Sequence, residues 1–483
     1  MSRLLLTTCA LCALLLIAGT IDLDQLDNYA DQSIPAYISK DNTTDNPITD
    51  YGATLGRVLF YDKQLSSDNA IACASCHQQE HAFSTLDVVS TGVSGTTGRH
   101  SMRLVNARFG EEVAFFWDER AATLEEQVTM PIQDHIEMGW SGTLGDGDID
   151  DLIVKLSQLD YYEPLFTHAF GDATITEARM QQALAQFVRS IQSFDSKYDV
   201  GRAQVNNNGQ PFPNFTAEEN AGKQLFGAPP QFVPDNLTLD NGQTIQVSRR
   251  TGGGLGCQGC HAAPEFDIDP NSLNNGIIES LIGTTPELNI TRSPSLRDLL
   301  KADGTLNGGV FHTGLGSGDD LDVITDHYNL PSTDLAANPD LDPRLRPGGR
   351  VQFLDMTDTE VAQLHAFLRT LTGTNVYTDP KWSDPFDDMG NLTIIGSTVS
   401  VAEVPEATIS VYPNPVSELL VVECELTDAT IRLFDTQGRL LHTEQPMGYS
   451  TQIDVASLPA GQYLVQVVDA QGRMIGVKKV VKR

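Results

Sequence analysis

Cys73-Ala-Ser-Cys76-His77 occurs early in the chain, and Cys257-Gln-Gly-Cys260-His261 repeats the same pattern in the second half. C-x-x-C-H is the attachment signature of a c-type haem: the two thiols take the vinyl groups of one porphyrin, and the adjacent imidazole lies under the iron. A zinc site also uses C-x-x-C pairs, but it does not require His after each pair. The two motifs therefore predict two covalently bound haems c, with His77 and His261 as iron ligands.

The sequence around each motif is a diverged internal repeat. Leu55-Gly-Arg-Val-Leu-Phe60 precedes the first motif and Ala221-Gly-Lys-Gln-Leu-Phe226 precedes the second. Each half then returns to a helical pattern, over 176–193 in the first half and 361–372 in the second. Thr357 and Glu360 form a capping box before the later helix. We therefore expect two cytochrome c-like haem domains in tandem and a mainly α fold.

The ends of the chain differ in character from this middle part. Arg3 followed by the apolar run Leu4–Ile17 and small residues up to Thr20 predicts a secretory signal peptide, and that run is too short to span a membrane comfortably. After about residue 405, short alternating segments separated by turns predict a small β-sandwich. The expected divisions are a signal peptide at 1–20, a first haem domain at 21–200, a second at 201–374, a linker at 375–405 and the β-sandwich at 406–483.

Bulk properties limit the partners. The formal net charge is −33, which argues against nucleic-acid binding. Four of the five Cys after the signal segment belong to the haem motifs, and Cys424 remains alone, so disulfides do not build the fold. No later stretch is long and apolar enough to span a membrane. The sequence leaves a homodimer open.

Further motifs give the middle of the chain a family resemblance. Phe116-Trp-Asp-Glu-Arg-Ala-Ala-Thr-Leu-Glu-Glu-Gln127, then Met130-Pro-Ile and Glu137-Met-Gly139, resemble the bacterial dihaem cytochrome c peroxidase / MauG family. Ala185-Gln-Phe-Val-Arg-Ser190 and Arg292-Ser-Pro-Ser-Leu-Arg297 agree with it, and the resemblance runs from about residue 50 to 373. It implies a peroxidatic haem under His77 and an electron-entry haem under His261.

The same resemblance implies roles for individual residues. Glu137 and Gln127 match the family's distal pair, in which the carboxylate moves a proton between peroxide oxygens and the amide holds the peroxide. Trp117 matches a tryptophan between the two haems; a core aromatic is the plainer interpretation, and both can hold. Tyr328 falls on the sixth ligand of the second haem, with Met356 and then His327 as rivals. A Met ligand raises the haem potential and an oxygen ligand lowers it.

Two places depart from the family pattern. The family binds calcium between its domains through an Asn side chain and backbone carbonyls, which would lie near Asn307 and Gly309. This chain has His100 at the Asn position, and imidazole is a poor calcium ligand. The loop at 90–99 also lacks the closing His expected near Gly92. We therefore expect an open first haem at rest, with closure by His100 as the alternative and His81 too near His77 to cross the ring.

The C-terminal segment has a resemblance of its own. Val411-Tyr-Pro-Asn-Pro415, Leu458-Pro-Ala-Gly-Gln-Tyr463 and the basic end Lys478-Lys-Val-Val-Lys482 resemble a type IX secretion sorting domain. A carbohydrate-binding or adhesion sandwich is the alternative. The sorting resemblance implies transport by the type IX machinery and a final place in the periplasm or cell envelope, on the cell surface or outside the cell.

Three functions follow as hypotheses. The first is a dihaem peroxidase that reduces hydrogen peroxide to water with electrons from a small cytochrome or another one-electron donor. The second is a MauG-like oxidase that modifies a partner protein by long-range hole transfer, which the Tyr328 assignment motivates. The third is a dihaem electron carrier without turnover, against which Glu137 and Gln127 argue.

Overall fold

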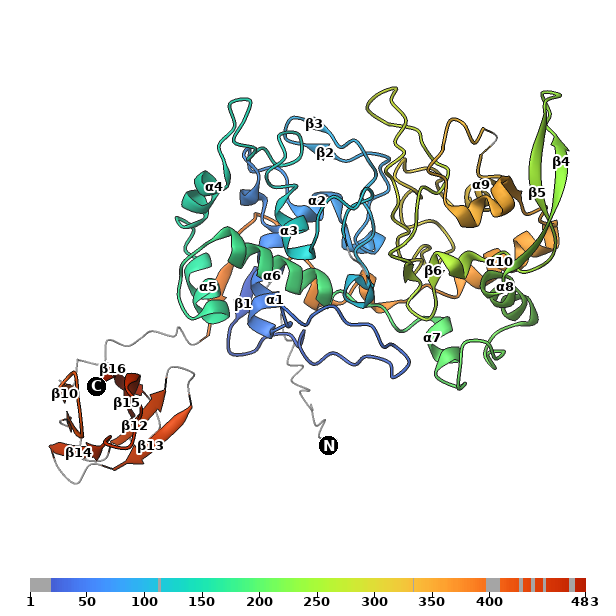
Figure 1. Cartoon of the computed structure of the whole chain (residues 1–483). Coiled ribbons are helices and arrows are strands. Elements are labelled where there is room, and N and C mark those ends of the chain that lie inside the picture. The colour runs from blue at the N-terminus through green and yellow to red at the C-terminus, as the bar shows by residue number, and fades with distance from the viewer. Residues whose placement is uncertain are drawn as a thin grey trace, which may run out of the picture. The chain divides into compact units, whose positions relative to one another are not determined.

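The computed structural model describes residues 19–111, 114–332, 334–396, 409–424, 429–435, 439–445, 449–468 and 474–483. The chain divides into two compact units, residues 1–396 and 397–483, and each is described by itself (Figure 1). Most of the predicted signal peptide, residues 1–18, lies outside the described residues. Among the described residues, no helix has the length and apolar character needed to cross a membrane.

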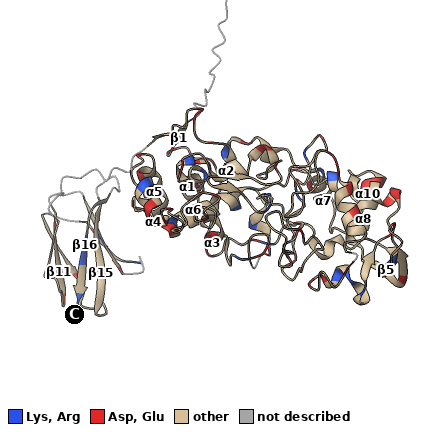
Figure 2. Cartoon of the chain, turned by 90° about the horizontal axis from the view of Figure 1, so that it is seen from above, with Lys and Arg blue, Asp and Glu red and all other residues tan. Residues whose placement is uncertain are grey.

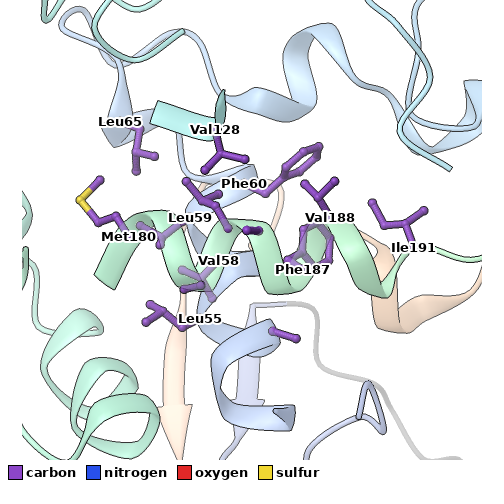
Figure 3. Packing of buried hydrophobic residues seen from close by; sticks show 14 of the residues in the cluster. Leu55, Val58, Leu59, Phe60, Leu65, Val128, Met180, Phe187, Val188 and Ile191 are labelled. Carbon is purple, nitrogen blue, oxygen red and sulfur yellow. The ribbon is translucent and has the colours of Figure 1, made fainter. Parts of the chain in front are cut away.

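The first half of the larger unit is built on the crossing of α1 (Asp50–Tyr61) and α6 (Glu177–Ser190). Thr49 and Thr176 cap these helices through their side-chain oxygens. The helices touch at Gly56, where a Cβ would lie 2.0 Å from the carbonyl oxygen of Ala183. Around this contact the apolar faces of both helices interlock (Figure 3); the buried side chains include Leu55, Val58, Leu59, Phe60, Met180, Phe187 and Val188.

The second half repeats this crossing with α8 (Ala217–Gly227) and α10 (Asp358–Arg369). Here the contact is at Gly222, where a Cβ would lie 1.9 Å from the carbonyl oxygen of Gln363. The capping box of Thr357 with Glu360 is confirmed at the start of α10. Gly56 and Gly222, the glycines of the two sequence repeats, thus have the same structural role. Each lacks a side chain and so lets its helix contact the backbone of the partner helix.

The remaining elements of the larger unit are short and joined by loops. The helices are α2 (Cys73–Cys76), α3 (Leu124–Thr129), α4 (Ile149–Leu156), α5 (Tyr162–Phe170), α7 (Lys197–Arg202) and α9 (Asp322–Asn329). The 3-10 turns are η1 (Lys63–Leu65), η2 (Gln79–His81), η3 (Ala107–Phe109), η4 (Cys257–Gly259), η5 (Pro343–Leu345) and η6 (Pro347–Gly349). Two-residue strands pair as β2 (Thr91–Gly92) with β3 (Gly95–Thr96) and β6 (His261–Ala262) with β7 (Asp267–Ile268).

A long hairpin precedes the second motif. It consists of β4 (Pro230–Thr238) and β5 (Thr244–Gly253), and β8 (Val351–Phe353) joins β5 in parallel. This hairpin, these loops and the C-terminal strands leave 26% of the structure helical. The expectation of a mainly α chain is therefore too strong. The physical reason is that much of each half is irregular chain wrapped around a cavity, which needs no helical repeat.

The predicted linker at 375–405 is wrong over its first part. Residues 375–396 pack on the first half through η7 (Asn375–Tyr377), η8 (Pro380–Trp382) and β9 (Thr393–Ile395), which pairs in parallel with β1 (Thr20–Asp22). Trp382 and Val376 are buried in the core of α1 and α6. The Tyr61 hydroxyl donates to the Trp382 carbonyl at 2.7 Å. The buried side chains of Val376 and Trp382 therefore hold residues 375–396 in place, although the polar composition of this segment predicts a linker.

The smaller unit contains the predicted strands. One sheet has the order β10 (Ser410–Tyr412), β11 (Leu419–Glu423), β14 (Ser450–Asp454), and the other β13 (Leu440–Glu444), β12 (Thr430–Asp435), β15 (Gly461–Val468), β16 (Met474–Lys482). Neighbouring strands pair antiparallel. Alternate residues of both sheets form one core, for example Leu420, Ile431 and Val465. Acidic and basic residues are interspersed over the larger unit (Figure 2).

Two truncations test the boundary at residue 397. Deleting 397–483 should leave the unfolding free energy of the larger unit unchanged, because the cores of the two units are separate. Deleting 375–483 should lower it by at least about 3 kcal/mol, since loss of a buried Trp alone costs about that much. Denaturant unfolding of the purified proteins, followed by circular dichroism, measures both. Equal destabilisation by the two deletions would contradict the boundary.

Candidate active site

The first motif opens on a cavity of about 460 Å³ in the first half of the larger unit. Cys73, Cys76 and His77 line this cavity. The His77 ring places Nδ1 2.9 Å from the carbonyl oxygen of Phe83, which can only accept, so Nδ1 carries the proton and Nε2 keeps its lone pair. Burial lowers the pKa of His77 and keeps the ring neutral. A neutral imidazole fixed through its other nitrogen is the usual form of a metal ligand.

Glu137 and Gln127 line the same cavity. Gln127 is presented by α3, and Glu137 by a turn in which the Asp134 carboxylate accepts the backbone N–H groups of Ile136 and Glu137 at 2.8 and 3.0 Å. Burial, reinforced by the Asp134 charge, raises the pKa of Glu137 to about 7. The carboxyl group can thus accept or release a proton near neutral pH, which suits general acid–base work.

The loop at 90–99 is fastened beside Glu137. The backbone N–H groups of Val93 and Ser94 donate to the carbonyls of Glu137 and Ile136, both at 3.1 Å. Gly92 lines the cavity, and a Cβ there would lie 2.1 Å from the Ile136 carbonyl oxygen. The backbone contact that holds the loop therefore leaves no room for a side chain at the place where the closing His was expected.

The second motif opens on a narrower cavity of about 90 Å³, lined by Cys257 and His261. Cys257 begins η4, which follows Gly256 in the left-handed region at φ 76°. Burial lowers the pKa of His261 to about 4, so this imidazole is also neutral. Apolar side chains fill most of the remaining wall; they include Phe226, Leu255, Leu364 and Leu368.

Both main candidates for a second iron ligand line this cavity. Tyr328 lies on α9, and Met356 follows β8, so the two approach from different segments. Burial raises the pKa of Tyr328 above its usual range, so the phenol is protonated at neutral pH. His327 does not line the cavity, and its Nε2 lies 2.9 Å from the Asn275 carbonyl oxygen. The geometry therefore keeps Tyr328 and Met356 as candidates and disfavours His327.

One wall is shared by the two cavities. The residues that line both cavities are His100, Met102, Arg103, Trp117 and Arg292. The Trp117 indole is 7% exposed, and its Nε1 donates to the His100 carbonyl at 2.8 Å. The Trp117 carbonyl accepts the N–H groups of Thr291 and Arg292 from the second half. Trp117 is thus a core aromatic and also stands between the cavities.

Comparison with known proteins agrees with this geometry. Residues 50–206 match the family model described as di-haem cytochrome c peroxidase, which includes the first motif, Trp117, Gln127 and Glu137. This part of the chain is therefore a domain of the dihaem cytochrome c peroxidase / MauG family. Residues 410–483 match the model of a secretion system C-terminal sorting domain, which supports export from the cytoplasm to the cell envelope or surface.

The relatives extend over most of the larger unit. A methylamine utilization protein MauG of Methylophilus methylotrophus is 28% identical over 71% of this chain and 86% of its own length. The cytochrome-c peroxidase IdrP1 of Denitromonas iodatirespirans is 24% identical over 70% and 86%. A crystal structure of a MauG-like protein associated with microbial copper homeostasis has a TM-score of 0.55 and 26% identity, covering 74% of this chain and 99% of that one.

The family implies two haems c, and the residues present fit them. The first cavity is lined by Cys73, Cys76 and His77, and the second by Cys257 and His261, with Cys260 next to His261 in the chain. Each cavity thus has thiol chemistry, a neutral imidazole and a mainly apolar wall, which suit a covalent haem. The family's calcium ion is a different case. The His100 ring fills its expected place, with Nδ1 3.0 Å from the Asp87 carbonyl oxygen and Nε2 3.3 Å from the Ser84 hydroxyl.

The surroundings of His100 also disagree with calcium. A Cβ at Gly308 would lie 3.2 Å from Nε2 of His100, so the backbone that was expected to ligate the ion packs directly on the ring. Burial lowers the pKa of His100 to about 4, and the neutral ring is already hydrogen-bonded. Calcium requires six to eight oxygen ligands. These residues do not fit a calcium ion, and the same hydrogen bonds argue against His100 as a closing ligand.

Three residues of the shared wall escaped the sequence analysis, namely Met102, Arg103 and Arg292. Arg103 stands three residues after His100, and Arg292 begins a motif that the resemblance covers, but neither has a spacing that signals a role. Only the fold brings them between the cavities. A search for basic residues near family motifs would have found Arg292 and not Arg103.

Chelation tests the calcium conclusion. Treatment of the purified protein with excess EGTA should change neither its thermal midpoint nor its peroxide turnover, because the His100 side chain occupies the place of the ion. Added calcium should restore nothing. His100→Ala should lower the unfolding free energy by about 1–3 kcal/mol, since the Ser84 hydroxyl and Asp87 carbonyl lose a buried partner. A fall in the thermal midpoint on chelation that calcium reverses would refute this assignment.

Proposed function

We propose that this protein is a dihaem c-type peroxidase that reduces hydrogen peroxide to water with electrons from an external one-electron donor. The observation that carries the proposal is a cavity with His77 on one side and Glu137 with Gln127 on its wall, joined through Trp117 to a second motif-bearing cavity. When bound, the haem at His77 supplies the iron that polarises peroxide and takes up its oxidising equivalents.

Glu137 is the proton carrier in this proposal. Its carboxylate accepts the proton from the inner peroxide oxygen and returns it to the outer oxygen, which leaves as water. A pKa of about 7 lets one group perform both steps near neutral pH. Gln127 holds the outer oxygen through its amide N–H. The fastened loop at 90–99 keeps the opposite face of the cavity free for peroxide.

Trp117 and the second cavity provide the electron route. The indole lines both cavities, is almost fully buried and is oxidised more readily than an aliphatic side chain, so it can relay electrons one at a time. We assign Tyr328 as the sixth ligand of the haem at His261, ahead of Met356. This assignment of Tyr328 is supported by its position in the wall of the second cavity, where its side chain interacts with Asn275, another residue of that wall.

A MauG-like oxidase that modifies a partner protein is the alternative. Two observations favour it: Tyr328 in the second cavity, and relatives named MauG that match most of the larger unit. A steady-state assay with peroxide and a reduced donor separates the two. Rapid donor oxidation supports the peroxidase, slow donor oxidation despite fast reaction with peroxide supports the oxidase, and no reaction with peroxide supports an electron carrier.

The export route completes the proposal. We assign residues 1–20 as a signal peptide and the C-terminal unit as a type IX sorting module that takes no part in chemistry. Support for the second point is that the haem motifs and cavities all lie within residues 1–396. The protein would then act in the periplasm, on the cell surface or outside the cell.

Haem content is the first expected outcome. The denatured protein should give a pyridine haemochrome equivalent to two c-type haems per chain, because each motif holds two thiols at the spacing of one porphyrin. Cys257→Ala with Cys260→Ala should reduce that value to one. A ratio of one in the parent protein, or bound zinc in its place, would refute the assignment.

Glu137→Gln should keep both haems and lower kcat/KM for peroxide by about a hundredfold to ten-thousandfold. In the parent protein kcat/KM should fall as the pH drops below about 7, since protonation of Glu137 removes the base. This pH dependence should be absent in the variant. Glu126→Gln, which changes an exposed acid of α3, is the matched control. Turnover of the Glu137 variant within about twofold of the parent would remove Glu137 from the mechanism.

The resting spin states test the open first haem. Low-temperature EPR of the fully oxidised protein should show one high-spin and one low-spin ferric signal, because Gly92 stands where the closing His was expected and the His100 ring is held by Asp87 and Ser84. His100→Ala should leave the high-spin signal in place. Two low-spin signals in the parent, one of them lost in His100→Ala, would identify His100 as a closing ligand.

A further inference from the structure

Arg103 is a partly buried cation, and among the described residues no ion pair joins it to an acid. Its Nη2 donates to the Ser295 carbonyl at 3.3 Å, and its Nε is buried without a hydrogen-bond partner. Burial lowers the pKa of Arg103 to about 10, yet a guanidinium with such a pKa keeps its charge at neutral pH. A buried charge that lacks a counter-ion is strongly destabilising. An anion bound beside Arg103 would remove this cost.

Protein carboxylates do not supply that anion. The charge of Asp298 acts on Arg103, but the described residues show no ion pair between them, and burial raises the pKa of Asp298 and favours its neutral form. One Asp298 oxygen already accepts the Tyr377 hydroxyl at 3.0 Å and the Gly373 N–H at 2.8 Å.

Two other arginines of the first cavity are already paired. Arg99 contacts Asp118 at 2.7 Å and Glu287 at 3.2 Å, and Arg120 contacts Asp118 at 2.8 Å. These two line only the first cavity, whereas Arg103 lines both. Arg103 thus differs from Arg99 and Arg120 both in its place and in its missing counter-ion. Arg292 also lines both cavities, and its Nη1 donates to the Ala114 carbonyl at 3.0 Å.

The haems themselves bring suitable anions. A haem held through thioether bonds at one edge carries its two propionate carboxylates at the opposite edge. A guanidinium presents five N–H donors in a planar fork that matches carboxylates and can serve two of them at once. We propose that Arg103 binds a propionate of each haem and so forms one ionic bridge between the two cofactors. This inference rests on the proposed attachment of two haems.

The bridge gives Arg103 a positioning and tuning role. Its charge acts on both haems, and a nearby cation disfavours the ferric form, which carries one more positive charge than the ferrous form. The bridge also fixes both propionate edges beside Trp117, on the same wall. Arg103 therefore sets the potentials of both haems in common.

Potentiometric titration of the full-length holoprotein tests the bridge. In Arg103→Gln the midpoint potentials of both haems should fall, and they should become more dependent on pH between 5 and 8, because the propionates lose the cation that keeps them ionised. Arg120→Gln is the matched control: its side chain is 43% exposed and lines only the first cavity, so the potential of the second haem should not move. Unchanged potentials in Arg103→Gln, or a shift of one haem alone, would overturn the bridge.

If Arg103→Gln does not attach its haems properly, a second variant and a second measurement still test the proposal. Arg103→Lys keeps the charge and loses the fork, so resonance Raman spectra should show shifted propionate bending bands for both haems while the potentials stay near those of the parent. Unshifted bands would overturn the proposal. The pyridine haemochrome of the parent protein is read separately: fewer than two haems per chain refutes the proposed function, whereas two haems with unshifted bands refute only the bridge.

Discussion

The backbone contact between two crossing helices is the constraint on which both cavities depend. Gly56 lets α1 reach the carbonyl of Ala183, and Gly222 lets α8 reach the carbonyl of Gln363. Four residues after each glycine, one helical turn along, a phenylalanine lines the cavity of its own half: Phe60 in the first and Phe226 in the second. The partner helices contribute Leu184 and Val188 to the first cavity and Leu364 and Leu368 to the second. A larger residue at either glycine would separate the helices and move these walls. The shape of each cavity, and so the fit of its cofactor, therefore depends on the packing of the crossing helices.

The two halves are similar in their helices and different in their polar groups. The first cavity has Glu137, a partly buried acid whose pKa is raised to about 7 by burial, and a loop held by its own backbone hydrogen bonds. The second has Tyr328 and Met356 instead, and no titratable acid lines it. In the proposed function, one repeated scaffold therefore serves two purposes: an open position for peroxide in the first half and a closed haem for electron storage in the second. The difference arises from loops, not from the helices that carry the repeat.

Much of this could be predicted from the sequence, for local reasons. The thiols and imidazoles of each motif are adjacent in the chain, and the Thr357–Glu360 box acts within one turn. Glu137 and Trp117 were found through family motifs, and the structure lines cavities with both. Residues 375–396 were predicted to be a linker because their composition is polar, but burial of Val376 and Trp382 in the core holds this segment on the larger unit. Arg103 was missed because its lack of a counter-ion is a property of the folded interior. The choice between Tyr328 and Met356 stayed open because two distant segments meet at one cavity.

His100 shows how the shared wall is held without a metal ion. Its ring joins Ser84 and Asp87, its carbonyl accepts the Trp117 indole, and its N–H donates to the His312 carbonyl of the second half at 2.8 Å. An ion at this place would organise carbonyl oxygens from both halves; the imidazole organises the same segments through directed hydrogen bonds. Protein groups alone supply the hydrogen bonds that orient Trp117 among the described residues. With Arg103 in the same wall, a fixed indole, a neutral imidazole and a guanidinium lie where the two cavities meet. If Arg103 binds a propionate of each haem, as proposed, a change at one haem is felt at the other through this residue.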